Sequence, residues 1–394
     1  MKKKKILRIL NRFNVGGPVY NAVYLTKYLD KNLFETLLIG GKPEMHEESA
    51  KYILDNEKIK FNEIKYMRRA ISPIYDFIAL IKIVWIIYNF RPDIIHTHAA
   101  KAGLIGRIAS LFYNKQVKII HTYHGNVFEG YFSKLINKVI LNVERFLASK
   151  SDKIIAISKS QKNDLVNKYF ICNEEKIKII PLGFDLKRFS LNLENKRLNK
   201  RNEFRVNKDE VLISIIGRLV PIKNHKFFID VIKYCKNKTK ISLKALIIGD
   251  GPEMNNLIKY TKEVGLEYNY KKMKNDYDIF FCSWKRDIDS FLAASDIVAL
   301  TSNNEGTPVS IIESMATGKA SISTNVGGVS DIIENYKSGI VSKNTVKDFG
   351  NDLLKLIIDK NLRSKLGTNG KIQSLRLFNY DVLVDNVEKL YESI

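Results

Sequence analysis

Two carboxylates lie close to an expected helix start in the second half of the chain, with Glu305 before it and Glu313 inside it. Thr307 is the expected N-cap, Pro308 the first helical residue, and Gly318 the end of the helix. Because Glu313 has apolar neighbours, its charge is costly unless hydroxyl or N–H groups contact it. The N-terminus of a helix also favours an anion. The pattern therefore predicts a ligand that carries hydroxyl groups on both sides of a phosphate.

Cations follow two other expected strand ends in this half. Gly217 ends one strand, and Arg218 and Lys223 come after it, five residues apart, where they could converge on a diphosphate. Arg286 follows a second strand that ends near Cys282, and it could line a nucleotide pocket or be a solvated surface charge. These positions favour a site for a phosphorylated ligand.

The first half of the chain has one comparable turn. Gly16 and Gly17, followed by Pro18, come after the first expected strand and open a helix. Two glycines let the backbone approach an anion at the helix N-terminus, although a plain strand-to-helix turn would also use glycine. The turn does not have the dinucleotide-binding pattern G-x-G-x-x-G.

Four of the six histidines, namely His96, His98, His121 and His124, lie at two expected strand ends and could be drawn as a metal site. We expect His96 and His98 to point to opposite faces of their strand, which would prevent them from sharing an ion. No Asp-x-Asp motif appears where a divalent ion would hold a diphosphate. We therefore expect neither a metal nor a cofactor, with Lys, Arg and helix dipoles in their place.

The composition is that of a globular protein. The 394 residues are enough for two domains, each with its own core. With 45% hydrophobic and 27% charged residues, the chain is neither disordered nor of low complexity. The three cysteines, Cys172, Cys235 and Cys282, are odd in number and far apart, so we expect neither a disulfide framework nor a zinc ribbon, and a cytoplasmic location.

Positive charge is concentrated in the first half, where residues 1–190 carry 33 Lys and Arg against 17 Asp and Glu, in a chain of net charge +23. Arg68 and Arg69 precede an apolar run, Phe77 to Phe90, that is too short to cross a bilayer. This run is either a buried amphipathic helix or a surface helix that touches lipid. We expect the first domain to attach peripherally to the anionic inner face of the cytoplasmic membrane. No motif supports a nucleic-acid partner.

Apolar segments of strand length alternate with longer helical patterns, which is typical of βαβ units and parallel sheets covered on both faces. The expected strands are Ile6–Leu10, Glu35–Gly40, Asp93–His96, Val117–His121, Lys153–Ile157, Lys178–Pro181, Val211–Gly217, Leu243–Gly249, Asp278–Cys282, Asp296–Thr301, Lys319–Ser323 and Ser338–Val341. We predict an α/β fold of two consecutive Rossmann-like, doubly wound domains facing a cleft. The expected parts are a first domain over 1–186, a polar linker over 187–208, a second domain over 209–375, and a C-terminal helix over 376–394 that packs back on the first domain.

Several of these motifs resemble one family. In the second half, they resemble the donor domain of retaining glycosyltransferases of the GT-B fold, family 4, at Gly217-Arg218 with Lys223, at the Glu305-x7-Glu313 pair and at Asn325-Val326-Gly327-Gly328. In the first half, the segments 90–98, 101–103 and 121–132 resemble bacterial surface-polysaccharide members of that family. The resemblance spans nearly the whole chain, but Val19 stands where many members have a Glu two places after the Gly-Gly pair.

The resemblance implies a role for each matching position. Arg218 and Lys223 would hold the diphosphate of a nucleotide-sugar donor, and Glu313 would bind the ribose hydroxyls. Glu305, with the backbone of Gly306 and Thr307, would bind the transferred sugar. Gly17 would approach the phosphate from the first domain, and His124 would lie near the reacting sugar. The expected catalytic residues are thus His124, Arg218, Lys223 and Glu305, and the expected donor-binding residues are Gly16, Gly17, Gly217, Arg286, Gly306, Thr307, Pro308, Val309 and Glu313.

The resemblance also implies the reaction. It is the transfer of a sugar, with retained configuration, from a nucleotide-diphosphate sugar, expected to be a UDP-sugar, to a lipid-linked or polysaccharide precursor of a cell-surface glycan. The alternatives are a nucleotide-sugar epimerase on a similar scaffold and a non-catalytic binding protein. Because no two carboxylates can be assigned as nucleophile and acid/base, we expect a front-side mechanism in which Arg218 and Lys223 stabilise the departing diphosphate.

Overall fold

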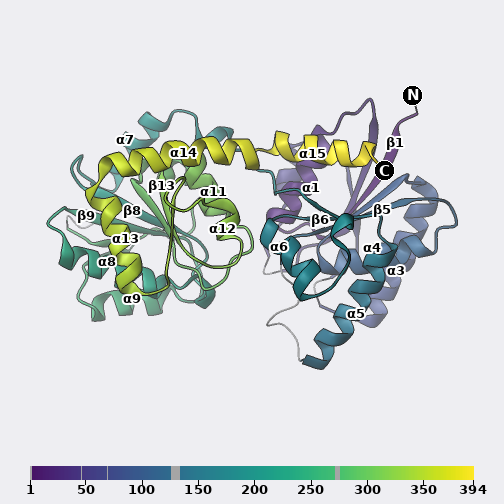
Figure 1. Ribbon diagram of the computed structural model, residues 1–394, viewed down its shortest axis with the longest axis horizontal. Helices are drawn as coiled ribbons and strands as arrows, with labels where there is room; N and C mark the ends of the chain where they lie inside the picture. Colours follow the sequence, from purple (N-terminus) through teal and green to yellow (C-terminus); the bar gives the residue numbers. More distant parts are fainter. Residues whose placement is uncertain (1, 46, 69, 126–133, 271–275) are drawn as a thin grey trace. The chain divides into compact units, whose positions relative to one another are not determined.

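The structure is a computed structural model of the chain, and it describes all residues except 1, 46, 69, 126–133 and 271–275. Arg69 and residues 126–132 of the motif that begins at His121 therefore lie outside the described residues. The chain forms two compact units (Figure 1). The first comprises Met1–Phe184 with Phe378–Ile394, and the second comprises Asp185–Leu377.

The first unit is built on a parallel sheet whose seven described strands run in the order β3-β2-β1-β4-β5-β6-β7. The strands are β1 (Lys4–Arg12), β2 (Phe34–Gly41), β3 (Phe61–Ile64), β4 (Ile94–His98), β5 (Lys118–Tyr123), β6 (Lys153–Ala156) and β7 (Ile177–Ile179). β1 pairs with both β2 and β4, so the order of winding reverses between β1 and β4. Doubly wound sheets bind ligands beyond the carboxyl ends of the strands at such a point.

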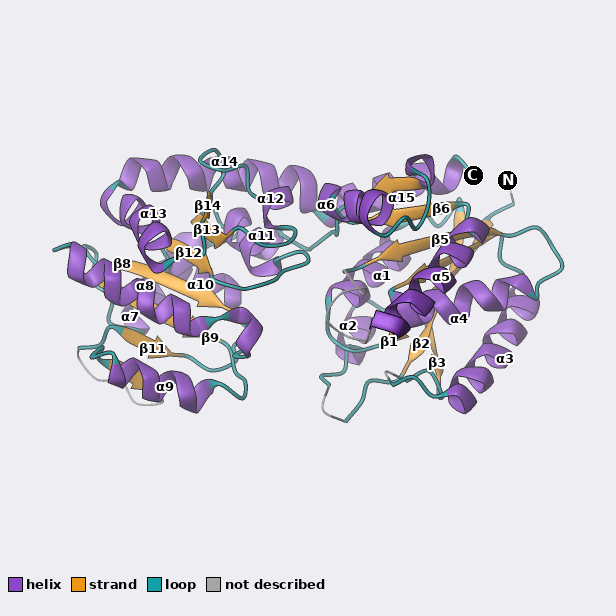
Figure 2. Ribbon diagram, turned by 60° about the horizontal axis from the view of Figure 1, so that its bottom comes forward, coloured by secondary structure: helices purple, strands orange, loops and turns teal. Residues whose placement is uncertain are grey.

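Helices cover both faces of this sheet (Figure 2). They are α1 (Gly17–Tyr28), α2 (Lys51–Asn56), α3 (Pro73–Phe90), α4 (Ala100–Leu111), α5 (Lys134–Lys150), α6 (Lys159–Asn163) and α15 (Tyr380–Glu392), with the short helices η1 (Asp164–Lys168) and η2 (Glu174–Lys176). One face of the sheet packs on α1 and α15 through Leu25, Leu383 and Tyr391. The other face packs on α3 and α4 through Ile83 and Ile105. The C-terminal helix α15 thus completes the first unit.

The second unit repeats this architecture with a parallel sheet in the order β10-β11-β9-β8-β12-β13-β14. Its strands are β8 (Val211–Ile216), β9 (Leu243–Ile248), β10 (Tyr268–Tyr270), β11 (Ile279–Phe281), β12 (Ile297–Leu300), β13 (Ala320–Thr324) and β14 (Ile340–Ser342). Its helices are η3 (Lys187–Phe189), α7 (Leu193–Glu203), η4 (Pro221–Lys223), α8 (His225–Lys238), α9 (Met254–Glu263), α10 (Ile288–Ala294), α11 (Val309–Ala316), α12 (Val329–Ile332), α13 (Val346–Ile358) and α14 (Lys360–Phe378).

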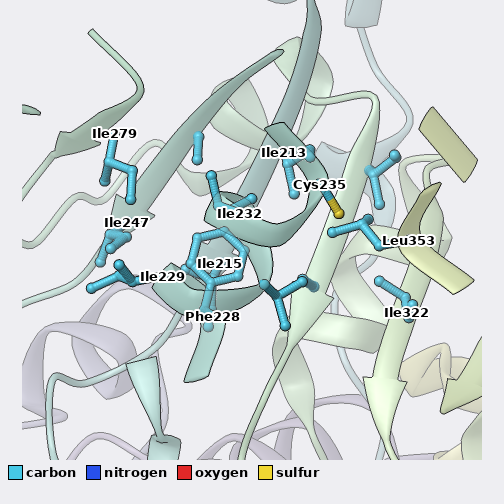
Figure 3. Close-up of a cluster of buried hydrophobic side chains, with 14 of the residues drawn as sticks. Ile213, Ile215, Phe228, Ile229, Ile232, Cys235, Ile247, Ile279, Ile322 and Leu353 are labelled. Atoms are coloured by element: carbon cyan, nitrogen blue, oxygen red, sulfur yellow. The ribbon is translucent and has the colours of Figure 1, made fainter. Parts of the chain in front are cut away.

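Apolar side chains fill the space between this sheet and its helices. Figure 3 shows part of the cluster, with Ile213 and Ile215 of β8 beside Phe228 and Ile232 of α8 and Leu353 of α13. β8 and β9 are buried on both faces, as central strands of a covered parallel sheet are. Two Rossmann-like α/β domains are therefore present, as the alternating pattern predicted.

The sequence missed one strand in each sheet. Both missed strands, β3 and β10, lie at a sheet edge and have only four and three residues. Asn62 and Glu63 in the middle of β3 are exposed, so the strand has no apolar run. Short, polar edge strands resist aggregation but resemble loops in a sequence.

The polar segment 187–208 is not the expected linker, because η3 and α7 within it belong to the second unit. α7 packs against α10 and neighbouring residues through ion pairs. Arg197 Nη2 lies 2.6 Å from Asp296 Oδ1, and Lys196 Nζ lies 2.7 Å from Asp289 Oδ2. A helix held by charges lacks an apolar stripe, which explains the wrong prediction.

Two local expectations also change. Thr307 does not cap α11, since the helix begins at Val309 with Pro308 in the N-cap position and no side-chain cap. The apolar run from Phe77 is part of the 18-residue α3, and only one side of that helix is buried. Among the described residues, α3 is the one helix long and apolar enough to cross a membrane by length and composition.

Candidate functional site

An ion pair lies at the carboxyl edge of the second sheet. Lys223, at the end of η4 after β8, donates from Nζ to Glu305 Oε1 at 2.5 Å. Ser302 Oγ donates to the same carboxylate oxygen. The Glu305 side chain is only 9% exposed, so the lysine and the hydroxyl compensate most of its lost hydration. The structure therefore brings together a cation and a carboxylate that the sequence predicted separately.

Glycines position the backbone around this pair. A Cβ at Gly327 would lie 1.8 Å from the carbonyl oxygen of Glu305, and one at Gly328 would lie 2.0 Å from that of Gly306. The N–H of Gly328 donates to the Glu305 carbonyl at 3.1 Å. The Gly-Gly pair of the family motif is thus a packing requirement, because any side chain there would push the 305–306 segment away.

Glu313 has a separate environment on α11. Burial raises the pKa of Glu313 to about 7, while Arg188 opposes the shift and Asp289 adds to it. Arg188 Nη2 lies 3.9 Å from Glu313 Oε1 and is half exposed. Glu313 is therefore poised between a neutral acid and a carboxylate near neutral pH. Arg188 lies just inside the segment expected to be a linker, and no local motif indicated that it would face Glu313.

The other predicted donor residues lie after strands of the same sheet or at the start of α11. Arg218 and Arg286 are exposed after β8 and β11, and the Arg286 guanidinium lies 5.5 Å from the ring centre of Trp284. Gly217 lies beside the aliphatic part of Lys223. Thr307, Pro308 and Val309 form the start of α11, where no described side chain caps the helix. The first N–H groups of α11 therefore remain available to an anion.

Two Asp-x-Asp sequences do occur, at Asp276-Tyr277-Asp278 and, after β11, at Asp287-Ile288-Asp289. The second holds a helix rather than a ligand. Asp287 Oδ2 lies 2.9 Å from Lys200 Nζ, and Asp289 pairs with Lys196. Both carboxylates thus hold α7 in place. Among the described residues, no group of three or more His, Cys, Asp and Glu side chains could hold a metal ion.

The first unit has its own pocket at the carboxyl ends of β1 and β4, with a volume of about 190 Å³. It is lined by Leu10, Asn11, Arg12, Asn14, Gly16, Pro18, Val19, His98 and Ala99. Arg12 binds both carboxylate oxygens of Glu47 through Nε and Nη2, at 2.8 and 2.7 Å. Within the described chain, Arg12 Nη1, Asn11 Oδ1 and His98 Nε2 are buried without a hydrogen-bond partner. The pocket therefore offers polar atoms that a ligand could satisfy.

Glycines at this pocket differ from those beside Glu305. A Cβ at Gly16 or Gly17 would meet its nearest neighbours at 3.8 and 3.6 Å, which is ordinary contact. Protein packing in the described structure thus does not require glycine at either position. Gly16 N-caps α1, and its carbonyl accepts from the N–H groups of Val19 and Tyr20.

His98, which lines this pocket, is paired with a second histidine. His98 Nδ1 and His124 Nε2 lie 2.9 Å apart. Burial lowers the pKa of His124 to about 3 and that of His98 well below its usual value, so both rings are neutral at pH 7. A neutral imidazole has one N–H and one bare nitrogen. Because the two rings share one hydrogen bond, their outer nitrogens must differ, with one donating and the other accepting.

A further pair of contacts fixes the ring of His96, which stacks on His98. The Tyr391 hydroxyl of α15 lies 2.5 Å from His96 Nδ1, and Thr122 Oγ1 lies 2.7 Å from His96 Nε2. His96 and His98 stack with ring centres 4.2 Å apart. The prediction that they point to opposite faces is therefore wrong, since residues two apart on a strand share a face.

His121 is separate from the other three. Its Nδ1 lies 2.8 Å from Thr97 Oγ1, and a Cβ at Gly103 of α4 would lie 2.4 Å from its Cε1 atom. His121 thus packs under α4. With both nitrogens of His96 already engaged, the four rings do not converge on one ion.

Known protein families match both halves of the chain. The profile described as Glycosyltransferase Family 4 matches residues 15–188, and the one described as Glycosyl transferases group 1 matches residues 196–373. A UDP-Gal:alpha-D-GlcNAc-diphosphoundecaprenol alpha-1,3-galactosyltransferase of Escherichia coli is 31% identical over 82% of this chain and 81% of its own. The chain is a family 4 glycosyltransferase.

Other relatives agree with this membership. The Staphylococcus aureus capsular polysaccharide biosynthesis glycosyltransferase CapM is 26% identical over 84% of this chain and 86% of its own. The crystal structure of Anabaena Alr3699/HepE in complex with UDP has a TM-score of 0.81 and is 20% identical, covering 99% of this chain and 100% of that one. This likeness shows that the glycosyltransferase has the GT-B fold.

Sequence reasoning gave no role to several residues that contact or neighbour the predicted positions within each unit, namely Arg12 and Tyr391 in the first unit and Arg188 and Ser302 in the second, and it considered His98 only as a metal ligand. Ser302 and His98 belong to segments already singled out, and their polarity at a strand end was the available signal. Arg188 reaches Glu313, and Tyr391 reaches His96, from remote elements of their own units, so no spacing could indicate them.

Proposed function

We propose that this glycosyltransferase transfers a sugar from a UDP-sugar to a hydroxyl group of a lipid-linked or polysaccharide precursor, with retained anomeric configuration, at the cytoplasmic face of the membrane. The E. coli relative, whose name includes both UDP-Gal and a diphosphoundecaprenol acceptor, supports this choice of donor and acceptor class. The name of CapM supports a role in surface-polysaccharide synthesis.

The contact between Lys223 and Glu305 carries the donor-side proposal. A bound diphosphate would attract Lys223 more strongly than a single carboxylate does, and Arg218 is free to reach the same phosphates from the surface. Glu305 would then accept hydrogen bonds from the sugar hydroxyls instead. The pair would thus separate only when an intact donor supplies both the phosphates and the sugar, which ties catalysis to the correct substrate.

Charge development explains how the same residues would act in the reaction. As the bond between the sugar and the diphosphate breaks, negative charge grows on the phosphate oxygens, and Arg218, Lys223 and the N-terminus of α11 would stabilise it. The sugar gains positive charge, which Glu305 would stabilise. Glu313 would accept hydrogen bonds from the ribose hydroxyls, and its position near Arg188 would favour the carboxylate form.

The pocket beside His98 is the proposed position for the acceptor hydroxyl. Since His98 and His124 are neutral, they would orient that hydroxyl by hydrogen bonds rather than remove its proton as strong bases. In a front-side mechanism, the departing diphosphate takes the proton. Gly16 and Gly17, which packing leaves unconstrained, would allow close approach of the donor phosphate to α1.

A donor panel tests the proposal. Purified enzyme is incubated with UDP-glucose, UDP-galactose, UDP-N-acetylglucosamine and GDP-mannose, each with and without a polyprenyl-diphosphate sugar acceptor, and products are identified by mass spectrometry and NMR. We expect acceptor-dependent transfer from a UDP-sugar, with an α-linked product from an α-linked donor. Conversion of donor without acceptor would indicate an epimerase, and tight binding without turnover would indicate a binding protein.

Chelation tests the metal independence of the proposed reaction. Lys223, Arg218 and the α11 N-terminus supply the positive charge at the diphosphate, so transfer should persist in excess EDTA. Loss of activity with EDTA that magnesium or manganese restores would contradict this part of the proposal.

A further inference from the structure

Helix α3 of the first unit has two apolar sides. Its inner side packs into the core through Ala79, Ile83, Ile86 and Ile87. Its outer side exposes Ile74, Phe77, Ile78, Ile81, Trp85 and Tyr88, with Ile74 74% and Phe77 62% exposed. These outer residues recur at helical spacing and form one continuous stripe. Large apolar patches of this kind are unusual on a soluble surface and indicate an interaction site.

Helix α5 has a second exposed stripe, formed by Leu135, Ile136, Val139, Val143 and Phe146. α4 packs against both α3 and α5, and Figures 1 and 2 show the three helices side by side. Leu111 and Phe112 at the end of α4 are also exposed. Exposed apolar side chains therefore occur beyond α3, whose run from Phe77 was the one segment that the sequence analysis considered for lipid contact.

The charged residues of α3 and α5 are mostly basic. The sequences of α3 and α5 contain one acidic residue each, Asp76 and Glu144. Asp76 Oδ1 lies 2.6 Å from Lys101 Nζ, and Glu144 is buried with Arg107 at 2.7 Å. No acid in either helix is therefore free to repel an anionic partner.

The exposed cations are suited to a lipid surface. Lys82 on α3 lies with Nζ 4.4 Å from the ring centre of Trp85, and Lys138 and Lys150 are exposed on α5. Arg68 stacks over Tyr75 at the start of α3. Tryptophan and tyrosine beside lysine and arginine are typical of the boundary between headgroups and acyl chains.

The inner side of α3 determines how it could meet a membrane. A spanning helix would have to remove Ile83 and Ile87 from the core, where neither is exposed. A helix lying in the plane of the interface keeps this packing and buries only the outer stripe. The structure therefore favours interfacial contact over insertion across the bilayer.

We propose that the outer faces of α3 and α5 form a docking surface for an anionic lipid bilayer, which they enter to the depth of the headgroups with Trp85 at the boundary. The inference rests on the proposed function only in the choice of a lipid-linked acceptor, which this surface would bring to the enzyme. Binding to the bilayer itself depends on the two helices and not on the sugar.

Tryptophan fluorescence tests the contact without changing the surface. Trp85 and Trp284 are the two tryptophans, so Trp284→Phe leaves Trp85 as the reporter in the full chain. We expect a blue shift and quenching by brominated lipid with phosphatidylcholine/phosphatidylglycerol vesicles, and neither with phosphatidylcholine alone. An unchanged Trp85 spectrum on anionic vesicles would overturn the proposal.

Cosedimentation of charge variants tests the residues. Phe77→Glu with Val139→Glu should weaken binding to anionic vesicles at least tenfold, whereas Ile358→Glu, an equally exposed change on α13 of the second unit, should not. Raising the salt concentration should also weaken binding. Equal binding of the double variant, or salt-independent binding to neutral vesicles, would overturn the proposal, as would a stable dimer in which the same substitutions abolish self-association instead of lipid binding.

Transfer assays separate this proposal from the proposed function. With a short-chain soluble acceptor, the double variant should keep its activity, and with a long-chain acceptor in vesicles it should lose at least tenfold. If no UDP-sugar is transferred to either acceptor while Trp85 still enters anionic vesicles, the proposed function fails and the docking surface stands. If both acceptors are used equally well by both proteins, the docking surface fails alone.

Discussion

The carboxyl edges of the two sheets differ in the charge of the side chains that they carry. In the second unit, carboxylates face cations at the edge, with Glu305 beside Lys223 and Glu313 beside Arg188. In the first unit, His98 and His124 are neutral because burial lowers both pKa values. The same fold thus builds a site in which carboxylates face cations, here called the charged site, and a site whose histidines are neutral, here called the neutral site, with the Arg12–Glu47 ion pair beside them.

The difference follows from what each site would hold. A diphosphate that gains charge as it leaves would be stabilised by fixed cations, and the Glu305 carboxylate holds one such cation, Lys223, in place without a ligand. An acceptor hydroxyl is neutral, and uncharged imidazoles can orient it without a strong field. The comparison teaches that one fold can carry different side-chain chemistry at its strand ends.

Acidification should affect the two units differently, and this is the largest expected effect. Burial lowers the pKa of His96, His98, His121 and His124 in the first unit, whereas the second has His225 alone, with a pKa lowered to about 4. Below pH 6.5 the unfolded chain binds protons that these folded rings do not. Each ring therefore lowers the free energy of unfolding by up to about 1.4 kcal/mol for every pH unit below 6.5.

Hydrogen exchange followed by mass spectrometry between pH 7 and pH 5 measures this effect. Peptides from β4 and β5 should lose protection before those from β8 and β9. Glu313 acts in the opposite direction, because its raised pKa of about 7 makes the folded state bind a proton that the unfolded state releases above about 4.5. Its contribution to the second unit thus grows as the pH falls from 7. Simultaneous loss of protection in both units would contradict the comparison.

Removing the cation of the charged site should have the next largest effect. Lys223→Met removes the proposed diphosphate contact and leaves Glu305 buried with Ser302 alone. We expect kcat to fall by about 10²- to 10³-fold, the size seen when one preorganised donor is lost. Lys226→Met, on the exposed side of the adjacent α8, is the matched control and should keep its rate. Equal rates in the two variants would remove Lys223 from the mechanism.

Substitution of the two carboxylates of the charged site should have different effects on the affinity for free UDP. Losing a hydrogen bond to a charged group weakens binding by about ten- to a hundredfold, so Glu313→Gln should weaken UDP by that factor. Glu305→Gln should lower turnover while leaving UDP affinity nearly unchanged. Calorimetric titration of both variants measures this, with melting curves as the control for folding. Equal weakening of UDP by both changes would refute the assignment.

Titration with pH sharpens the same test. Since the pKa of Glu313 is about 7, the carboxylate form increases between pH 6 and pH 8, and UDP affinity should increase with it. Glu313→Gln removes this contribution and leaves only the ionisation of the UDP phosphate. An identical pH dependence in the two proteins would show that Glu313 does not bind the nucleotide.

The smallest expected effect concerns the glycines of the neutral site. Gly16→Ala meets no close neighbour, so its melting temperature should stay near that of the parent, while turnover should fall by about tenfold if the donor phosphate approaches there. Gly103→Ala, which would clash with His121, should instead lower the melting temperature. Unchanged turnover for Gly16→Ala would leave that turn a plain connection between β1 and α1.

The sequence by itself determined the two α/β domains and the donor motif. Buried central strands such as β8 and β9 are continuous apolar runs, and the turn after β8 and the start of α11 are read from adjacent residues. Such signals come from residues that are close together in the sequence. The edge strands β3 and β10 gave no such signal, because they are short and β3 is half exposed.

Only the tertiary structure decided which polar side chains meet. Tyr391 reaches His96 across 295 residues of chain, Arg188 reaches Glu313 from a segment that resembled a linker, and α7 is fixed by ion pairs such as Arg197 with Asp296. It also showed that His96 and His98 share a face and that α5 exposes an apolar stripe of its own. Local periodicity specifies which side of an element is apolar, but partners between remote elements depend on how those elements pack, which no local pattern encodes.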